Sequence, residues 1–218
     1  MLALIDADIV NYRCAASAEN DDSDIALMRV EVTIKDILDA TGATQYKCFL
    51  TGNTNFRKEI APTYKANRTA PRPKHWEACR QFLVTHHKAE IVEGYEADDA
   101  LGMEQRDNGT TICSIDKDML QLPGRHYNFV RKEFYDVTPD QGLKSFYTQS
   151  LVGETSDNII GVPGIGPKKA AKLLDPLLPE EYYEACKNQY DSVERFHTNC
   201  KLLWIWRKPH DVWSPPGA

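Results

Sequence analysis

Acidic side chains occur in four short clusters of this sequence. Three clusters directly follow apolar runs that predict strands, and the fourth precedes a glycine-rich turn. The clusters are Asp6 with Asp8, Glu96 with Asp98 and Asp99, Asp116 with Asp118, and Glu154 with Asp157. In a parallel sheet such strand ends meet at one edge, where ligands bind. Nine carboxylates gathered there repel one another unless cations neutralise them, so the spacing predicts hard divalent metal ions such as Mg²⁺ or Mn²⁺.

Simpler explanations exist for individual acids. A carboxylate in the first turn of a helix complements the helix dipole, and this is an equally good interpretation of Asp98 or Asp99 taken alone. Asp22 and Asp24 are interpreted as solvated caps. Recurrence at successive strand ends favours the metal interpretation. The sequence has no Cys/His cluster suited to zinc, no GxxxxGK[ST] motif and no evident triad partners for Ser114.

The charge is segregated along the chain. Lys and Arg number 26 against 32 Asp and Glu, for a net charge of -6. Without the nine clustered acids the balance would be +3, as expected of an enzyme that binds nucleic acid. Residues 57–88 hold eight Lys or Arg against Glu59 and Glu77, a local balance of +6. This basic segment predicts a phosphate-binding surface.

The length of 218 residues, with 42% hydrophobic and 27% charged residues, is typical of one soluble globular protein. The six cysteines are far apart and include no CxxC pair, which indicates reduced, mostly buried thiols. The longest uncharged apolar run is far shorter than the roughly 20 residues that span a bilayer. We therefore expect no membrane span, no secretion signal and a cytoplasmic location.

Short apolar runs alternate with longer helical patterns, which predicts an α/β fold with a central, mainly parallel sheet and helices on both faces. The predicted strands are 2–5, 46–50, 90–92, 110–115 and 127–130. The predicted helices are 24–40, 75–87, 97–107, 141–151 and 192–207. Residues 53–73 contain three prolines, so we expect a partly ordered loop or short helices there.

A glycine-rich turn precedes a lysine-rich helical pattern in the run GVPGIGPKKAAKLL at 161–174. Its glycines allow a tight turn with exposed amides, and Pro167 suits the first position of a helix. Lys168, Lys169 and Lys172 add positive charge beside the helix start. A plain helix–helix turn is the alternative, but this combination favours binding of a nucleic-acid phosphate backbone.

Six motifs, in order, resemble those of the structure-specific 5′-3′ exonucleases and flap endonucleases, most of all the short phage exonucleases. They are Ile-Asp-Ala-Asp at 5–8, Phe-Arg at 56–57, Tyr-Lys-Ala-Asn-Arg at 64–68, Glu-Ala-Asp-Asp at 96–99, Asp-Lys-Asp at 116–118, and Ser-Asp-Asn-Ile-Ile-Gly-Val-Pro-Gly-Ile-Gly-Pro-Lys at 156–168. The resemblance implies a PIN-like, Rossmann-like catalytic core over 1–140, with an arch segment at about 53–88. A helical part over 141–218 would contain a helix-three-turn-helix motif at about 151–175.

The resemblance also implies a set of ligands for two divalent ions. These ligands are Asp6, Glu96, Asp98, Asp99, Asp116, Asp118, Glu154 and Asp157, with Asp8 nearby. Two departures from the family pattern stand out. Glu154 replaces the usual Asp, and the second strand ends in Thr51, Gly52 and Asn53, where the family has an Asp. We expect weaker metal binding at one position, which does not by itself imply loss of activity.

For DNA contacts, the resemblance assigns Lys65 and Arg68 to the arch through which a 5′ single strand passes, and gives both a catalytic role. Tyr64 would stack on a terminal base, with ordinary loop packing as its alternative, and Arg57 would also contact DNA. In the turn, Gly164, Gly166, Lys168 and Lys169 would grip the duplex. The carbonyl groups of this turn would hold a K⁺ ion.

The expected reaction is therefore hydrolysis of a DNA phosphodiester near a 5′ end, flap or branch, by water and two ions roughly 4 Å apart. RNA in hybrids is a further substrate to test. A setting in phage DNA replication or recombination, in the host cytoplasm, follows from the resemblance alone. Two alternatives stay open: a PIN-like ribonuclease, and a branched-DNA-binding protein that has lost catalysis.

Overall fold

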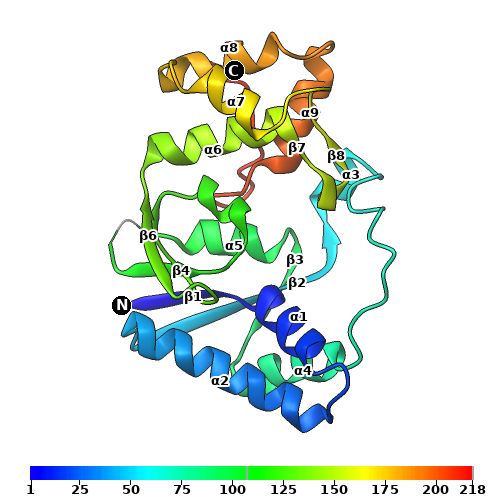
Figure 1. Cartoon of the computed structure of the whole chain (residues 1–218), viewed down its shortest axis with the longest axis vertical. Helices are drawn as coiled ribbons and strands as arrows, with labels where there is room; N and C mark the ends of the chain where they lie inside the picture. The colour runs from blue at the N-terminus through cyan, green and yellow to red at the C-terminus, as the bar shows by residue number, and fades with distance from the viewer. Residues whose placement is uncertain (107, 218) are drawn as a thin grey trace.

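A six-stranded sheet forms the centre of the computed structural model, which describes residues 1–106 and 108–217 (Figure 1). In the order β3-β2-β1-β4-β5-β6, the first five strands are parallel and β6 is antiparallel to β5. The strands are β1 (Leu2–Asp6), β2 (Gln45–Asn55), β3 (Glu90–Gly94), β4 (Thr110–Cys113), β5 (Gly124–Asn128) and β6 (Glu133–Val137). The predicted α/β fold class is confirmed.

The central strands β1 and β4 are buried on both faces. Ala3, Leu4 and Ile5 are inaccessible to solvent, and every residue of β4 is buried. This explains why β1 is apolar without alternation, as is typical of parallel strands covered on two sides. Their carboxyl ends lie beside each other, because Ile5 pairs with Cys113 in register.

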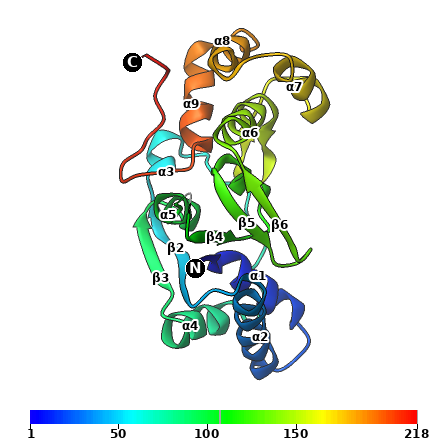
Figure 2. The same ribbon diagram turned by 90° about the vertical axis from the view of Figure 1, so that its left-hand side faces the viewer.

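Helices cover both faces of the sheet (Figure 2). On one face, α1 (Ala7–Ser17), α2 (Ser23–Thr41) and α4 (Trp76–His86) pack around a core that includes Val10, Ile34 and Leu83. On the other face, α5 (Ala97–Glu104) packs with Ile205 from the end of the chain. The C-terminal segment therefore completes the core between α5 and the sheet.

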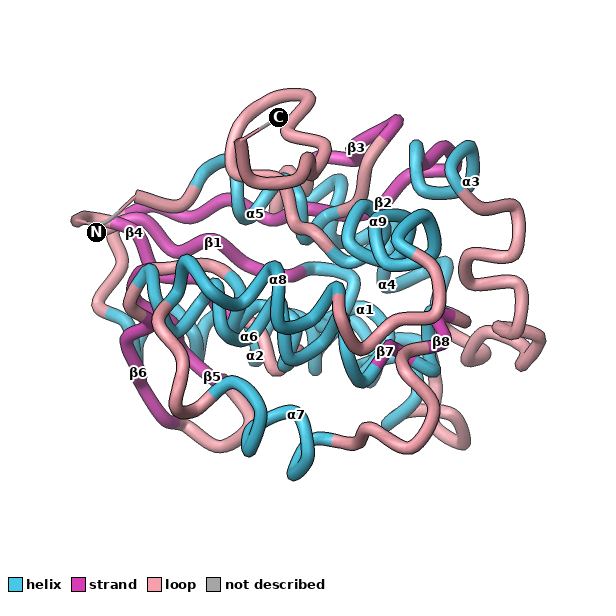
Figure 3. The backbone as a smooth tube through the Cα atoms, turned by 90° about the horizontal axis from the view of Figure 1, so that it is seen from above, coloured by secondary structure: helices cyan, strands magenta, loops and turns pink. Residues whose placement is uncertain are grey.

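A separate group of helices has its own apolar core. It comprises α6 (Pro139–Val152), α7 (Pro167–Leu174), α8 (Tyr182–Lys187) and α9 (Val193–Leu203), with the short strands β7 (Gly153–Glu154) and β8 (Ile159–Ile160) between α6 and α7. Three 3-10 turns accompany these elements: η1 (Lys117–Gln121), η2 (Thr155–Asp157) and η3 (Pro179–Glu181). In Figure 3 this group lies to one side of the long loop that follows α3 (Phe56–Ile60).

Several boundaries differ from the sequence-based prediction. Helix α1 was missed because it begins directly after β1 with no intervening turn signal, and β6 was missed because it is short and mostly exposed. The fifth strand lies three residues earlier than predicted at its start. Helix α5 ends at Glu104, before the predicted end, and Asp107 lies outside the described residues.

Helix α3 and the loop after it correspond to the segment expected to contain a loop or short helices. Residues 61–75 run down one side of the molecule from α3 to α4 (Figure 1). In the part of the chain that the structure describes, no helix has the length and apolar character needed to cross a membrane.

Gly102 allows the C-terminal segment to pass close to α5. A Cβ atom at Gly102 would lie 2.2 Å from the carbonyl oxygen of Trp206 and 3.0 Å from Leu122. We expect Gly102→Ala to lower the free energy of unfolding in urea by about 1–3 kcal/mol, because the backbone must shift. Gly166→Ala is the matched control, since its Cβ would meet nothing within 4 Å. Equal stability of the two variants would contradict this packing.

Candidate active site

Asp6 stands at the carboxyl end of β1 and is 1% exposed. Its carboxylate accepts hydrogen bonds from the backbone N–H of Ile9 at 3.1 Å and from the hydroxyl of Ser114 at 2.6 Å. The Ser114 hydroxyl also accepts from the N–H of Asp116 at 3.0 Å. Ser114 therefore connects the ends of β1 and β4, so the first and third acidic clusters lie together.

Asp98, in the first turn of α5, joins this group. Loss of solvation, followed by repulsion from Asp6 and Asp116, raises the pKa of Asp98 well above its ordinary value. Burial raises the pKa of Asp6 to about 7, opposed by the hydrogen bond from Ser114. These carboxylates repel one another, which is the electrostatic condition that a divalent cation relieves.

A second group of acids lies where η1 meets the β7–β8 segment. Loss of solvation raises the pKa of Asp118 to about 7, with added repulsion from Asp116, Glu154 and Asp157. The ammonium of Lys117 lies 2.7 Å from a carboxylate oxygen of Glu154. Burial acts against ionisation, yet the hydrogen bond from Lys117 helps to hold the pKa of Glu154 below its ordinary value. The longer Glu side chain therefore still reaches this group.

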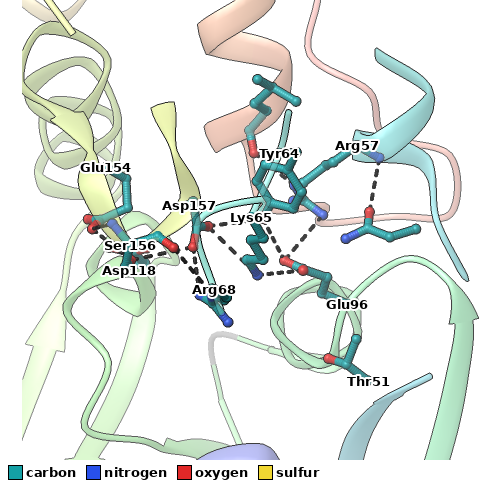
Figure 4. Close-up of polar contacts among 12 residues, drawn as sticks. Thr51, Arg57, Tyr64, Lys65, Arg68, Glu96, Asp118, Glu154, Ser156 and Asp157 are labelled. Atoms are coloured by element: carbon teal, nitrogen blue, oxygen red, sulfur yellow. Dashed lines mark hydrogen bonds and ion pairs between the residues drawn. The ribbon is translucent and has the colours of Figure 1, made fainter. Parts of the chain in front are cut away.

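Residues 63–68 dock directly on η2 and contribute cations to the site (Figure 4). The N–H of Lys65 donates to the carbonyl of Asp157 at 2.9 Å, and the Lys65 ammonium lies 2.5 Å from Glu96. The Arg68 guanidinium donates to Asp157 at 2.7 Å and to the carbonyl of Ser156 at 3.1 Å. Burial raises the pKa of Glu96, but the nearby Lys65 ammonium helps to lower it, and the net pKa of Glu96 is below its ordinary value. The structure thus brings Lys65 and Arg68 to the edge of the acidic groups.

The structure corrects the prediction for Asp99 and Arg57. Asp99 is inaccessible to solvent and forms a bidentate salt bridge with Arg57, with N···O distances of 2.6 and 2.9 Å. The N–H groups of Glu96 and Trp206 also donate to Asp99, each at 3.0 Å. Arg57 is 2% exposed. Asp99 is therefore an internal acceptor and not a free metal ligand, and Arg57 does not lie on a DNA-binding surface.

Tyr64 is also internal. Its side chain is 3% exposed and packs in the core of the helical group. Its hydroxyl lies 2.9 Å from Glu96 and 3.0 Å from Asp157, and its single proton is donated to one of these carboxylates at a time. The predicted base-stacking role is corrected, because this ring has no free face. Tyr64 instead holds two carboxylates from different elements at a fixed separation.

The glycine-rich turn projects from the molecule between β8 and α7. Gly164, Gly166, Lys168 and Lys169 are all exposed, and Gly164 has a positive φ of 76° that favours glycine. The ammonium of Lys169 donates to the carbonyl of Gly164 at 2.7 Å. Arg195 donates to the carbonyl of Gly161. Two of the carbonyl groups that were expected to face a K⁺ ion thus accept hydrogen bonds from cationic side chains instead.

Asp8 lies closer to the second strand than sequence reasoning indicated. Its carboxylate accepts from the N–H of Thr51 at 3.0 Å and lies 3.7 Å from Arg80. Arg80 donates to the carbonyl of Thr51 at 2.8 Å. Asp8 therefore places a negative charge at the end of β2. The only sequence signal for this was its spacing of two residues from Asp6.

A cleft of about 1070 Å³ opens along this edge of the sheet. Asp6, Asp98 and Asp116 line one part of it, and Lys65 and Arg68 line its rim. In residues 1–106 and 108–217, no three His, Cys, Asp or Glu side chains already stand close enough to enclose an ion. Mg²⁺ typically keeps several waters and takes only one or two carboxylates, so an open arrangement of mutually repelling carboxylates fits it.

The family model for the N-terminal, resolvase-like domain of 5′-3′ exonucleases matches residues 1–150. The chain belongs to the 5′-3′ exonuclease family. The matched residues include the β1, α5 and β4 acidic clusters and the segment that carries Lys65 and Arg68. The confirmed family therefore agrees with the resemblance seen in the motifs.

Curated members of this family match over differing lengths. The 5′-3′ exonuclease of Bacillus subtilis (strain 168) is 29% identical over 180 residues, 72% of this chain and 55% of that protein. That of Buchnera aphidicola is 28% identical over 225 residues, 90% of this chain and 75% of that protein. DNA polymerase I of Rhizobium leguminosarum is 37% identical over 141 residues, which are 55% of this chain but only 14% of the polymerase.

Solved structures share the fold over almost the whole chain. A T5 protein co-crystallised with metal ions has a TM-score of 0.68 at 19% identity, covering 93% of this chain and 88% of that one. The T5 flap endonuclease, in a pseudo-enzyme-product complex with DNA and metal ions, has a TM-score of 0.67 at 19% identity with the same coverage. The helical group is thus part of a known architecture.

Burial of the carboxylates, together with their mutual repulsion, predicts a pH dependence of stability in the presence of a chelator. The folded protein holds the Asp6 and Asp118 protons up to a pKa of about 7, against an ordinary value of 3.8. Between these values the folded state binds more protons than the unfolded state, so the free energy of unfolding falls as pH rises. We expect thermal unfolding to show a lower Tm at pH 8 than at pH 5, with a shallower decline in Asp6→Asn. Equal slopes for both proteins would contradict the assignment.

Proposed function

We propose that this protein is a divalent-metal-dependent 5′ nuclease that hydrolyses DNA phosphodiesters near 5′ ends, flaps or branches. The observation that carries the proposal is the meeting of mutually repelling carboxylates with Lys65 and Arg68 in one open cleft. Family membership supports the same reaction. RNA in hybrids is a second substrate class for the assay, and DNA replication or recombination in a phage is the proposed setting.

The proposed metal ligands form two groups. One comprises Asp6, Glu96, Asp98 and Asp116, and the other comprises Asp118, Glu154 and Asp157. Two Mg²⁺ or Mn²⁺ ions, when bound, would activate water and offset charge on the scissile phosphate and the leaving 3′ oxygen. Ser114 positions Asp6 and Asp116, and the buried Arg57–Asp99 pair fixes the start of α5.

Lys65 and Arg68 act from positions beside these carboxylates. Their cationic groups stand against Glu96 and Asp157, within reach of a phosphate that enters beside those acids. Preorganised positive charge stabilises charge that develops on phosphate oxygens in the transition state. We assign both residues this role, together with the guiding of the 5′ strand past residues 61–75.

The helical part supplies the grip on duplex DNA in this proposal. Residues 1–140 carry the chemistry, with the arch segment within 53–88, and residues 141–218 bind the duplex through the motif at 151–175. The exposed backbone of Gly164 and Gly166 and the exposed side chains of Lys168 and Lys169 support this division. Lys169 substitutes for a K⁺ ion at the Gly164 carbonyl in this arrangement.

The test of the proposal is cleavage of a labelled duplex with a 5′ single-stranded flap, in Mg²⁺, in Mn²⁺ and in chelator. We expect short 5′ products only with metal, and a loss of at least about a thousandfold in rate for Asp118→Ala or Asp157→Ala, because each removes a ligand. DNA affinity should remain, and Asp24→Asn is the control from the surface of α2. Cleavage of an RNA hairpin but not of DNA, or binding without any cleavage, would overturn the proposal.

Asp8 supplies, in this proposal, the charge that the family pattern expects at the end of β2. We expect Asp8→Asn to weaken Mn²⁺ binding by about tenfold in calorimetric titration, as loss of a carboxylate near a metal does. Restoring the charge on the strand with Thr51→Asp in the Asp8→Asn background should recover part of this affinity. Unchanged Mn²⁺ affinity in Asp8→Asn, with Asp24→Asn as the reference, would remove Asp8 from the site.

A further inference from the structure

The cleft continues beyond the carboxylates into a region of different character. There it is lined by the aromatic rings of Tyr12 and Trp76 and by the basic side chains of Lys58, Arg72 and Arg80. Tyr12 is 56% exposed although it belongs to α1, whose other face is buried. An exposed aromatic wall beside basic groups is typical of surfaces that bind unpaired nucleotides.

Trp76 is the fixed element of this region. It begins α4, is half-buried, and packs against the core formed by α1, α2 and α4. The guanidinium of Arg72 lies 3.7 Å from the centroid of the indole, and that of Arg80 lies 5.3 Å from it. Because the core holds the ring, little conformational entropy is lost when another planar group stacks on it.

The two arginines differ in their other contacts. Arg80 is held by the carbonyl of Thr51 and by Asp8, which connects the indole to the edge of the metal-ligand group. Arg72 is exposed, and within the described residues it has no hydrogen bond or ion pair. The same is true of Lys58. Apart from the contact of Arg72 with the Trp76 ring, both side chains are available to contact phosphates.

We propose that Trp76, with Arg72 over its ring, stacks one unpaired nucleobase of the 5′ single strand while Lys58 and Arg72 contact the flanking phosphates. This inference rests on the proposed function and extends it, since it names the residue that holds the unpaired segment. Tyr64, the aromatic residue that the motifs indicated for this task, is internal. Trp76, in contrast, lines the open cleft, and a base reaches its ring where Arg72 now lies over it.

The test is a double-mutant cycle between protein and DNA, with binding measured by fluorescence anisotropy in chelator so that no cleavage occurs. The ligand is a 5′-flap duplex, either intact or with one abasic nucleotide at successive flap positions. At one position, the abasic site should weaken wild-type binding by about tenfold, within the range for one base–aromatic stack. Trp76→Ala should weaken binding of the intact flap equally and show no further loss at that position.

Three comparisons sharpen the test. Phe134→Ala is the matched control, because Phe134 is 41% exposed on β6 with Arg125 4.8 Å from its ring, outside the cleft. It should bind every ligand as the wild type does. Trp76→Phe keeps an aromatic ring if the alanine variant does not fold, and should retain part of the coupling. Arg72→Gln should reduce the slope of log affinity against log salt by about one.

The outcomes separate this inference from the proposed function. If the wild type cleaves the flap with Mg²⁺ but the abasic and Trp76→Ala effects multiply at every position, the stacking site is overturned and the nuclease stands. Wild-type affinity for the intact flap in Trp76→Ala would overturn it as well. If the wild type neither binds nor cleaves the flap duplex, both proposals fail together.

Discussion

The structure depends on how it accommodates negative charge at one edge of a parallel sheet. Asp6, Asp98 and Asp116 come from three separate elements. Besides burial, Asp116 raises the cost of ionising Asp6, and both Asp6 and Asp116 raise that of Asp98. Hydrogen bonds from Ser114 and the Ile9 N–H offset part of that cost. The rest of the cost remains, and in the proposed function it is what favours binding of hard cations in the cleft. An edge built for stability alone would carry fewer carboxylates.

The Arg57–Asp99 pair connects this edge to the helical group. Arg57 donates to the carbonyls of Leu202 and Trp204, both at 2.8 Å, so one guanidinium joins α3, α5 and the end of α9. Removing one partner from such a pair leaves an uncompensated buried charge, which typically costs about 3–5 kcal/mol. The acids of α5 and those near η2 are therefore held in one frame. This frame lets Tyr64 and Lys65 reach both groups.

Local sequence patterns, namely apolar runs, helical periodicity and acids at strand ends, predicted most of the fold and the two carboxylate groups. Asp6 and Asp116 follow apolar runs that are strands, and the parallel order of those strands brings them together. The roles of Arg57, Asp99 and Tyr64 could not be predicted in the same way. Their burial depends on backbone groups such as the Leu202 carbonyl, which is 145 positions from Arg57. Motif resemblance carries residue types but does not report which side of an element faces the interior.

The central claim is that the two carboxylate groups bind divalent ions, one group in the cleft and the other beside it. Anomalous diffraction from crystals grown with Mn²⁺ tests it most directly, because it locates the ions without any assay of activity. The account predicts one Mn²⁺ peak among Asp6, Asp98 and Asp116, and a second beside Asp118, Glu154 and Asp157. Peaks only at the protein surface, or none in the cleft at saturating Mn²⁺, would contradict it.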